Sequence, residues 1–291
     1  MESGPDGKRE LMRFSIVVVC YNAGDKLKET TISILDQSTT DYEIVIKDGM
    51  STDGSIEDLE ALVAERGAQA RVKIFREKDT GIYDAMNAAI KHASGEYYLF
   101  LNCGDLFYDE QVLQRFSDAI SEASVQFSEE KDSLRVFYGN RYLIPTKSVE
   151  YIAPRMTPLT CFRNIPCHQC CFYLADCFAE RGYRTDLKVR ADYEHFLWLF
   201  FAKKAKFHYV NACVAKYEGG GYSENPESVK RSAEEHRAIT KQYLSKWQLF
   251  YCNAYMILTL QPLRHFLATN PVFSRVYNKL VQGLYRIIGR K

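Results

Sequence analysis

A carboxylate follows an uninterrupted apolar run in the first half of this sequence. The tetrapeptide Asn-Cys-Gly-Asp at 102–105 comes directly after Tyr97–Leu101. Such a run is typical of a parallel strand buried on both faces, and open α/β sheets bind ligands in the crevice at the carboxyl ends of their strands. A carboxylate there could hold a divalent cation against a diphosphate. Because Asn, Gly and Asp also form ordinary turns, this stretch alone leaves both interpretations open.

Two further turns with polar side chains follow apolar runs nearer the N-terminus. Tyr21 and Asn22 come after the β-branched run Phe14–Cys20, and Asp48 opens a glycine-containing turn after Tyr42–Lys47. Parallel strands end on one edge of their sheet, so we expect these groups to converge with the turn at 102–105 in one crevice. An aromatic ring, two or three carboxylates and several backbone amides would meet there. Such a set of groups suits a nucleoside diphosphate.

The role of each side chain in that crevice follows from its chemistry. The Tyr21 ring could stack on a base, and Asp48 could accept a hydrogen bond from a base or a ribose. Asp105 could hold Mg²⁺ or Mn²⁺ through oxygen ligands. The segment after Asp48 is also typical of an Asx turn with a helix cap at Ser51 or Asp53, and for Asp53 we prefer that structural role.

Strands and helices that alternate along the chain must position these turns. The hydrophobic pattern predicts strands at 14–20, 42–47, 72–75 and 97–101, separated by helices at about 27–35, 55–64 and 82–92. This alternation implies an α/β fold with a mainly parallel sheet flanked by helices. Beyond residue 105 we expect a helix near 110–121, a strand at 135–138, a loop-rich stretch at 145–166 and a helix at 192–203. From residue 227 the chain is predicted to be mainly helical, broken at Pro262 and Pro271.

Length and composition indicate a globular protein. The chain has 291 residues, of which 46% are hydrophobic and 26% charged. Its nine cysteines are odd in number and lie mostly in apolar runs, so we interpret them as reduced side chains of a cytosolic protein rather than a disulfide framework. The polar segment 1–10 resembles neither a secretory signal nor a membrane anchor. No apolar stretch reaches ~18 residues, so we expect no transmembrane helix.

The C-terminal part of the chain is basic and aromatic, although the net charge of the whole is only +1. No Asp or Glu occurs from His236 to Lys291, while Lys, Arg and aromatic residues are interleaved there. Positive charge is usually solvated surface, but the interleaved aromatic residues favour contact with anionic lipid headgroups. We expect no nucleic acid partner, because no binding motif for one is present. These patterns divide the chain into a polar extension at 1–12, a main domain at 13–225 and a helical, basic extension at 226–291.

Four motifs in a fixed order make the chain resemble the family 2 glycosyltransferases. They are Val-Val-Cys-Tyr-Asn at 18–22, Lys-Asp-Gly-Met-Ser-Thr-Asp-Gly at 47–54, Lys-Asp-Thr-Gly-Ile-Tyr-Asp-Ala-Met-Asn at 78–87 and Leu-Asn-Cys-Gly-Asp at 101–105. Together they are specific, where a single one is not. Over about residues 14–220 the resemblance implies a GT-A fold, a nucleotide-sugar donor, a divalent metal and transfer with inversion at the anomeric carbon. We assign the donor half to about 13–106 and the acceptor half to about 107–225.

The resemblance implies donor contacts for residues in the first three motifs. Tyr21 would lie at the base with Asn22 beside it, and Asp48 would lie near the base or ribose. Asp79 would line the donor pocket. Many family members carry two adjacent acidic residues where this chain has Asp48 and Gly49. This departure leaves the choice between uridine and guanosine open, and we favour a UDP-sugar.

The fourth motif implies the metal site. Asn102 to Asp105 would stand in for the Asp-X-Asp element of the family, with Asn102 near the donor and Asp105 as the ligand of Mn²⁺ or Mg²⁺. Since Asn102 replaces an acid, the site carries one negative charge fewer. We therefore expect a modest metal affinity.

The resemblance continues in the acceptor half, at residues 167–169, 190–194 and 219–223. It implies that Asp192 is the general base that takes the proton from an acceptor hydroxyl as this oxygen attacks the sugar. An Asp before an apolar helix is also a good N-cap, which remains the alternative, with Glu194 as a reserve base. His168 could contact the diphosphate or the acceptor, or be a structural hydrogen-bonding residue. Zinc is not expected, because Cys167 and its neighbours lack a second ligand pair.

These patterns lead to one main hypothesis and two rivals. The main hypothesis is a cytoplasmic, peripherally membrane-bound inverting glycosyltransferase on the inner face of the cell membrane, which extends a lipid-linked glycan for bacterial surface polysaccharide. The first rival is a catalytically inactive nucleotide-sugar-binding subunit of a glycan-assembly complex. The second is a nucleotidyltransferase, which would release pyrophosphate instead of a nucleoside diphosphate.

Overall fold

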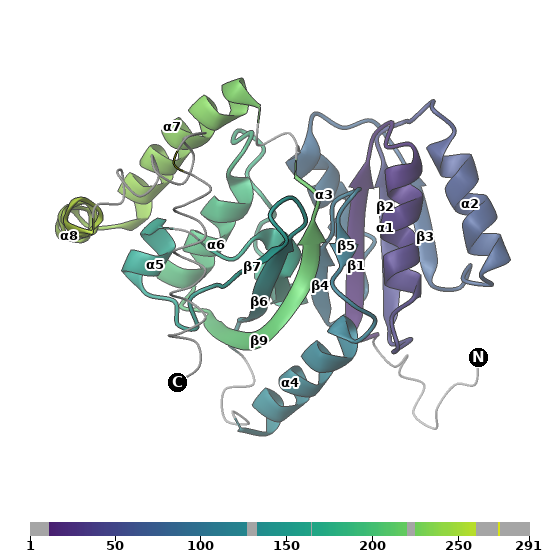
Figure 1. The fold of residues 1–291 in the computed structure, drawn as a ribbon, viewed down its shortest axis with the longest axis horizontal. Coiled ribbons are helices and arrows are strands. Elements are labelled where there is room, and N and C mark those ends of the chain that lie inside the picture. Colours follow the sequence, from purple (N-terminus) through teal and green to yellow (C-terminus); the bar gives the residue numbers. More distant parts are fainter. Residues whose placement is uncertain (1–11, 127–132, 164, 220–224, 260–272, 274–291) are drawn as a thin grey trace. The chain divides into compact units, whose positions relative to one another are not determined.

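The computed structural model describes residues 12–126, 133–163, 165–219, 225–259 and 273 (Figure 1). Contacts between residues divide the chain into two compact units, Met1–Ile239 and Thr240–Lys291. The polar extension at 1–12 lies outside the described residues, except for Met12. The chemistry-bearing motifs all fall in the first unit.

Strands and helices alternate along the first unit as far as the turn at 102–105 (Figure 1). The elements are β1 (Phe14–Cys20), α1 (Asp25–Leu35), β2 (Tyr42–Asp48), α2 (Ser55–Glu65), β3 (Val72–Arg76), α3 (Ile82–Ile90) and β4 (Tyr97–Phe100). β1 pairs in parallel with β2 and with β4, and β2 pairs in parallel with β3. The predicted alternation and its parallel sheet are therefore confirmed for this half. Because Val17 lies opposite Phe100, the turns after β1 and β4 begin on the same edge.

The second half adds strands of both directions to the same sheet. Its elements are β5 (Leu106–Phe107), α4 (Val112–Gln126), β6 (Arg135–Leu143), β7 (Ser148–Glu150), α5 (Pro158–Arg163), the 3₁₀ helix η2 (His168–Cys170), β8 (Cys171–Leu174), the 3₁₀ helix η3 (Ala175–Phe178), α6 (Ala191–Phe201) and β9 (Lys206–Tyr217). The strand order is β3-β2-β1-β4-β8-β6-β9-β5, with β7 beside β6. β8 is antiparallel to β4 and β6, while β9 is parallel to β6. The α/β class is confirmed, and β8 and β9 are strands that the sequence pattern did not predict.

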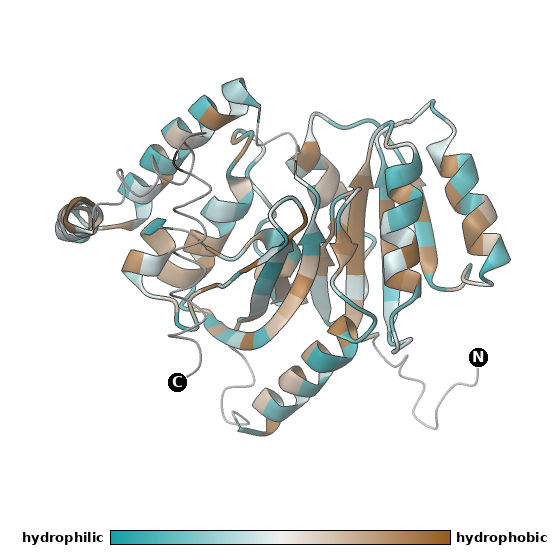
Figure 2. Cartoon of the chain, viewed as in Figure 1, coloured by the Kyte–Doolittle hydropathy of each residue, from teal (hydrophilic) through white to brown (hydrophobic). Residues whose placement is uncertain are grey.

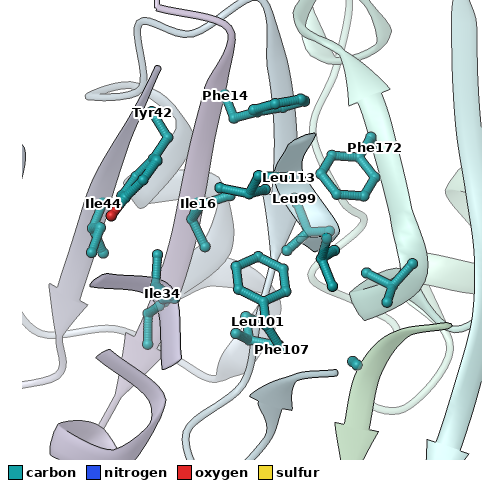
Figure 3. Packing of buried hydrophobic residues seen from close by; sticks show 14 of the residues in the cluster. Phe14, Ile16, Ile34, Tyr42, Ile44, Leu99, Leu101, Phe107, Leu113 and Phe172 are labelled. Atoms are coloured by element: carbon teal, nitrogen blue, oxygen red, sulfur yellow. The ribbon is translucent and has the colours of Figure 1, made fainter. Parts of the chain in front are cut away.

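The apolar core lies between the sheet and the helices that cover one of its faces (Figure 3). Phe14 and Ile16 of β1 pack there with Leu99 of β4, against Ile34 of α1 and Leu113 of α4. Successive strand residues point to opposite faces, so the intervening residues of β1 point to the other face, where α3 contacts β1 and β2. Figure 2 shows β1 hydrophobic over most of its length, as expected of a strand covered on both faces.

Helix α7 (Pro226–Tyr243) runs across the boundary of the two units, and α8 (Lys246–Leu258) belongs to the second. A capping box begins α8, in which the Ser245 hydroxyl oxygen accepts from the Gln248 N–H at 3.2 Å and the Gln248 side chain accepts from the Ser245 N–H at 2.9 Å. No helix within the described ranges is long and apolar enough to cross a membrane. The predicted breaks at Pro262 and Pro271, and the basic residues from Arg264 onward, lie outside the described residues.

Candidate active site

The turn at 102–105 is held from the side by helix α1. The buried Thr30 hydroxyl accepts a hydrogen bond from the Gly104 N–H at 2.9 Å and donates to the Asp105 carbonyl oxygen at 2.9 Å. Gly104 has a φ of 93°, a conformation that glycine adopts at low cost. Thr30 and Gly104 together determine where the Asp105 side chain leaves the backbone.

A cavity of about 810 Å³ opens where these turns meet. This volume is in the range of pockets that bind small molecules. Its wall comes from the turn after β1, the segment that leads into α3, the turn at 102–105, η2 and the start of α6. The predicted site residues that line it are Tyr21, Asp79, Asn102, Asp105, His168 and Asp192. Most of the predicted site is thus brought together in one place.

An exposed aromatic ring and a paired carboxylate form one side of the cavity. Tyr21 is 68% exposed, so its ring is free to stack on a planar ligand. Asp79 is paired with the buried Lys47 ammonium and accepts from the Gly81 N–H at 3.1 Å. A Cβ on Gly49 would lie 3.0 Å from Asp79 Oδ2 and 3.2 Å from Tyr21 Cδ2. The glycine at 49 therefore lets Tyr21 and Asp79 approach the backbone, where a second acidic side chain would crowd a carboxylate.

Asp48 does not line the cavity. Its side chain has no exposed surface and accepts hydrogen bonds from the Ser51 N–H at 3.0 Å and from Arg76 Nε at 3.0 Å. These donors satisfy a carboxylate that would otherwise be costly to bury. The contact between Asp48 and a base or ribose remains a prediction, and the structure gives Asp48 the further role of holding the turn at 48–54.

Asn22 also lies away from the cavity wall. Its side-chain oxygen accepts from the Thr52 N–H at 3.0 Å, so it ties the turn after β1 to the turn after β2. Asp53 does the same from the other side, because its Oδ2 accepts from the Gly24 N–H at 2.9 Å. The Asx turn preferred for Asp53 is confirmed, because its Oδ1 accepts from the Ser55 N–H at 3.2 Å, but the N-cap of α2 is Gly54 rather than Asp53. Donor contact by Asn22 remains a prediction.

Asp105 offers oxygen ligands in a nearly buried position. Oδ1 accepts from the Glu218 N–H at 3.0 Å, and Gln169 also hydrogen-bonds the carboxylate. Burial raises the pKa of Asp105, and these hydrogen bonds partly oppose the rise. In the described part of the chain no group of three or more His, Cys, Asp or Glu side chains could hold a metal ion. The carboxylate oxygens of Asp105 are donors of the kind that suit Mg²⁺ or Mn²⁺, which one carboxylate commonly binds together with the oxygens of a diphosphate.

A histidine, a carboxylate and a tyrosine meet on the opposite side of the cavity. His168 Nδ1 lies 2.9 Å from Asp192 Oδ2, and the Tyr83 hydroxyl lies 2.9 Å from Asp192 Oδ1. The Tyr83 hydroxyl is also 2.7 Å from the Val189 carbonyl oxygen. Burial raises the pKa of Tyr83 well above its usual range, so this hydroxyl stays protonated and donates. The three side chains come from η2, α6 and α3.

Asp192 lies inside the first turn of α6 and does not cap it. Arg190 is at the N-cap position, and the Asp192 Oδ1 accepts from the Tyr193 N–H at 2.9 Å. Burial alone would raise the pKa of Asp192, but hydrogen bonds from His168 and Tyr83 outweigh it and hold that pKa below its usual value. The reserve base Glu194 is fully buried and paired with Arg181 at 3.0 Å, away from the cavity wall.

Several cavity residues escaped the sequence analysis. Tyr83 lies within the motif at 78–87, so its position in that motif was an available signal. Three cationic residues also line the cavity without any local pattern that indicates it: Lys26, Arg141 and Lys188. Lys26 pairs with Glu218 at 2.5 Å, which joins α1 to the segment after β9. These cations suit an anionic ligand.

Comparisons with known proteins identify close relatives by sequence. The chain is 32% identical to a "PGL/p-HBAD biosynthesis glycosyltransferase" of Mycobacterium bovis over 212 residues, which cover 72% of this chain and 78% of the relative. It is 26% identical over 240 residues to the "putative teichuronic acid biosynthesis glycosyltransferase TuaG" of Bacillus subtilis, with 80% and 90% of the two chains covered.

Solved structures with the same fold include two glycosyltransferases. One is S. aureus TarS 1–349 in complex with UDP, with a TM-score of 0.64 at 18% identity, covering 89% of this chain and 74% of that one. The match covers 44% of the longer TarS chain. The other is the mannosyltransferase PcManGT of Pyrobaculum calidifontis with GDP-Man and Mn²⁺, with a TM-score of 0.60 at 15% identity, covering 96% of this chain and 88% of that one. The expected GT-A fold is confirmed.

The sequence model described as glycosyl transferase family 2 matches residues 15–203. This range holds all four ordered motifs together with His168 and Asp192, and all the predicted site residues that line the cavity. The chain is therefore a member of glycosyltransferase family 2, and it is a glycosyltransferase.

Proposed function

We propose that this glycosyltransferase moves a sugar from a nucleotide-sugar, preferably a UDP-sugar, to a hydroxyl of a lipid-linked glycan with inversion at the anomeric carbon. The observation that carries the proposal is the meeting of three groups in one cavity: the exposed Tyr21 ring, the Asp105 carboxylate and the Asp192–His168 pair. The Tyr21 ring suits the base of a nucleotide, and the Asp105 carboxylate suits a divalent metal that binds the diphosphate. The third can take a proton.

The names of the relatives support the biological context of the proposal. One relative is named for PGL/p-HBAD biosynthesis and another for teichuronic acid biosynthesis. Synthesis of a surface polysaccharide on a lipid-linked acceptor fits both names. The UDP preference is supported by TarS, a structural neighbour solved with UDP.

The proposed reaction needs a proton acceptor and a site for the leaving group on different sides of the sugar. In an inverting transfer the acceptor oxygen attacks the anomeric carbon from the side opposite the departing diphosphate, so the base lies beside the acceptor. Asp192, paired with His168, would take the proton. Lys26, Arg141 and Lys188 supply positive charge around the anionic donor. A divalent metal held by Asp105 would neutralise charge on the diphosphate.

We also propose that the enzyme works in the cytoplasm, at the inner face of the cell membrane. Large apolar side chains on α8 are exposed, namely Trp247, Phe250, Tyr251, Ile257 and Leu258. Trp247, Phe250 and Tyr251 are spaced by three and four residues, so they share one face of the helix. Together with the basic, acid-free sequence from His236 onward, this face suits the surface of an anionic membrane.

The donor site is tested by thermal unfolding with UDP-, GDP-, dTDP- and CMP-sugars, each with Mn²⁺ or with EDTA. A ligand at ~100 times its dissociation constant adds roughly 2.7 kcal/mol, so a true donor raises the melting temperature. We expect a metal-dependent rise with UDP-sugars, which Tyr21→Ala removes and Tyr151→Ala does not. Tyr151 is 66% exposed and does not line the cavity, which makes it a matched control.

The products separate the enzyme from its two rivals. With a lipid-linked glycan acceptor, release of a nucleoside diphosphate and growth of the glycan support the proposal. Release of pyrophosphate would instead identify a nucleotidyltransferase. A donor that binds but is never consumed, with any of a panel of lipid-linked acceptors, would favour the inactive subunit.

The membrane proposal has its own test in the full chain. We expect the protein to sediment with vesicles of about 30 mol% phosphatidylglycerol and about 70 mol% phosphatidylcholine. The phosphatidylglycerol supplies the anionic headgroups that attract basic residues. Trp247→Ser combined with Phe250→Ser should release it, while the matched pair Val125→Ser and Tyr151→Ser on exposed positions of the first unit should not. Equal sedimentation of the two double variants would refute the role of α8.

A further inference from the structure

We propose that Glu235 of α7 is a positioning residue for the transfer reaction, which holds the backbone of residues 188–190 and thereby the Asp192 carboxylate. The inference rests on the proposed function, in which Asp192 takes the proton of the acceptor hydroxyl. It gives a role in the active site to the segment after residue 225, which the sequence pattern assigns to a separate extension. Glu235 also lies outside the range 15–203 that matches the family model.

The Glu235 carboxylate accepts hydrogen bonds from three successive backbone N–H groups. Its Oε1 accepts from the Lys188 N–H at 2.8 Å, and its Oε2 accepts from the N–H groups of Val189 at 3.1 Å and Arg190 at 2.8 Å. Successive N–H groups of this kind form a concavity that binds anions. Hydrogen bonds to a carboxylate are also roughly twice as strong as those between neutral groups. A side chain at least 45 residues away along the chain thus fixes the conformation of this segment.

The segment that Glu235 holds is in contact with the proposed base. Residues 187–189 form part of the cavity wall just before α6, while Glu235 itself does not line the cavity. Val189 is held on both sides, since its N–H donates to Glu235 and its carbonyl oxygen accepts from the Tyr83 hydroxyl at 2.7 Å. The same hydroxyl lies 2.9 Å from Asp192 Oδ1. One backbone residue and one hydroxyl therefore connect Glu235 to the Asp192 carboxylate.

Further contacts fix α7 against the start of α6. Arg190, at the N-cap position of α6, donates from its Nε to the Ser232 carbonyl oxygen at 3.0 Å and to the Ser232 hydroxyl at 2.7 Å. Ser232 and Glu235 are three residues apart, so they lie on one face of α7. The His236 ring stacks on the ring of Tyr193, the residue after the proposed base, with 5.1 Å between the ring centroids. About one turn of α7 therefore holds the backbone and the side chains around the start of α6.

These contacts set the position from which Asp192 meets the acceptor. Asp192 lies in the first turn of α6, so a shift of the segment before α6 also moves its carboxylate. A base must come within hydrogen-bonding distance of the proton that it takes, and a displacement of about 1 Å can lower a rate about 10²-fold. The proposed donor contacts, at Tyr21 and Asp105, lie on the other side of the cavity. Loss of the Glu235 carboxylate should therefore lower kcat and leave donor binding unchanged.

The test compares transfer by the full chain with transfer by Glu235→Ala. We expect kcat to fall by about 10²-fold, while the thermal shift with a UDP-sugar and Mn²⁺ stays as in wild type. Sodium acetate should raise the kcat of Glu235→Ala several-fold relative to sodium chloride at the same ionic strength, because a free carboxylate can accept from the same three N–H groups. Glu234→Ala is the matched control, since Glu234 is the exposed neighbour on α7 and should keep the wild-type kcat.

Three results with Glu235→Ala would overturn the inference. The first is a kcat within about threefold of wild type, a difference of under 1 kcal/mol. The second is a loss of donor binding as large as the loss of kcat, because the substitution would then act on the whole cavity. The third is a fall in kcat that acetate does not relieve, which would assign Glu235 to folding alone. Each of these leaves the proposed function intact, whereas a wild-type enzyme that consumes no donor would overturn that function and the inference with it.

Hydrogen exchange in the wild-type chain keeps the inference testable if Glu235→Ala unfolds. The amide hydrogens of residues 188–190 should exchange roughly tenfold or more slowly than in a peptide of the same sequence, although the Lys188 side chain is exposed. Glu235→Gln keeps the shape of the side chain and removes one acceptor oxygen, so it should speed this exchange and lower kcat. Exchange in the folded wild-type chain at the rate of the peptide would overturn the inference without any substitution.

Discussion

The two sides of the cavity are built in different ways. On the donor side, turns follow neighbouring parallel strands, and hydrogen bonds hold them within one turn, as between Asp48 and Ser51, or between adjacent turns, as between Asn22 and Thr52. On the proton-accepting side, Asp192 meets His168 across 24 residues and Tyr83 across 109. The first arrangement is built mainly from turns that follow strands, with α1 and the segment after β9 holding the turn at 102–105. The second needs η2, α3 and α6 to pack correctly against one another.

This difference predicts which property a substitution on each side should change. A change on the donor side should act on ligand binding or on a single turn, because neighbouring strands hold the rest. A change on the proton-accepting side should act on catalysis, since three elements each supply one group to one cluster. Four predictions, in order of decreasing effect, can break or sharpen this contrast.

The largest effect is expected for Asp192→Asn. We expect kcat for transfer to fall by about 10³-fold, since the carboxylate that supports proton transfer is lost. The thermal shift with donor should be unchanged, because Asp192 belongs to the other side of the cavity. Steady-state kinetics and thermal unfolding measure the two quantities. Asp118→Asn, at an exposed position of α4, is the control that should leave both alone. Loss of donor binding in Asp192→Asn would remove the contrast between the two sides.

A donor-side change of comparable chemistry is Asp105→Asn. We expect donor affinity in Mn²⁺ to fall roughly a hundredfold, about 2.8 kcal/mol, because the proposed metal ligand loses its charge. Affinity in EDTA should change little. Calorimetric titration in both buffers measures this, and Asp109→Asn, whose carboxylate pairs with Arg115 at 2.8 Å, is the control. Equal affinities with and without metal in wild type would contradict the role of Asp105.

The unfolding free energy should depend on pH through His195, a buried group on the proton-accepting side. The buried His195 stacks on Phe178, and burial lowers its pKa to about 3. An unfolded histidine has a pKa of about 6.5, so the unfolded chain binds a proton that the folded one does not. Stability is therefore full above about pH 6.5 and falls as the pH drops through this window, by about 2 kcal/mol at pH 5. Urea unfolding at several pH values tests this, and a matching slope in His195→Phe would show that other groups carry the dependence.

The smallest effect is expected from a matched pair on α1. Thr30 and Thr31 are both fully buried, but Thr30 bonds the turn at 102–105 while Thr31 donates to Leu27 of its own helix at 2.8 Å. Thr30→Val should cost about 1 kcal/mol of unfolding free energy, because the Gly104 N–H loses its buried partner. It should also weaken metal-dependent donor binding. Thr31→Val should lower the unfolding free energy by less and should leave donor binding unchanged. Equal effects of the two variants would show that the Thr30 contact does not position Asp105.

The first half of the fold was predictable because its signals are local. The run Phe14–Cys20 is a strand with the predicted bounds, and the turns after β1, β2 and β4 carry the side chains that the motifs indicated. In contrast, β9 (Lys206–Tyr217) was missed, since its residues are mostly half-buried and its sequence mixes Lys, His and Asn with apolar residues. The four-residue strand β8 lies between two 3₁₀ helices and is too short for a periodic signal.

The candidate site divides in the same way. Tyr21, Asp79 and Asp105 follow strands that any parallel sheet would end on one edge, and they do line the cavity. Asp48 and Asn22 follow the same strands but turn inward to hold the turns together, a difference of side-chain direction that spacing along the chain does not encode.

By itself, the sequence determined the family, the parallel half of the sheet and the edge at which the donor should bind, because hydrophobic period and turn residues act over a few positions. Only the tertiary structure decided that His168 stands between Asp192 and Asn102, that Tyr83 joins them, and that Gly49 makes room for Tyr21 and Asp79. These contacts depend on how separate elements pack, and packing is set by the whole core rather than by neighbours in the chain.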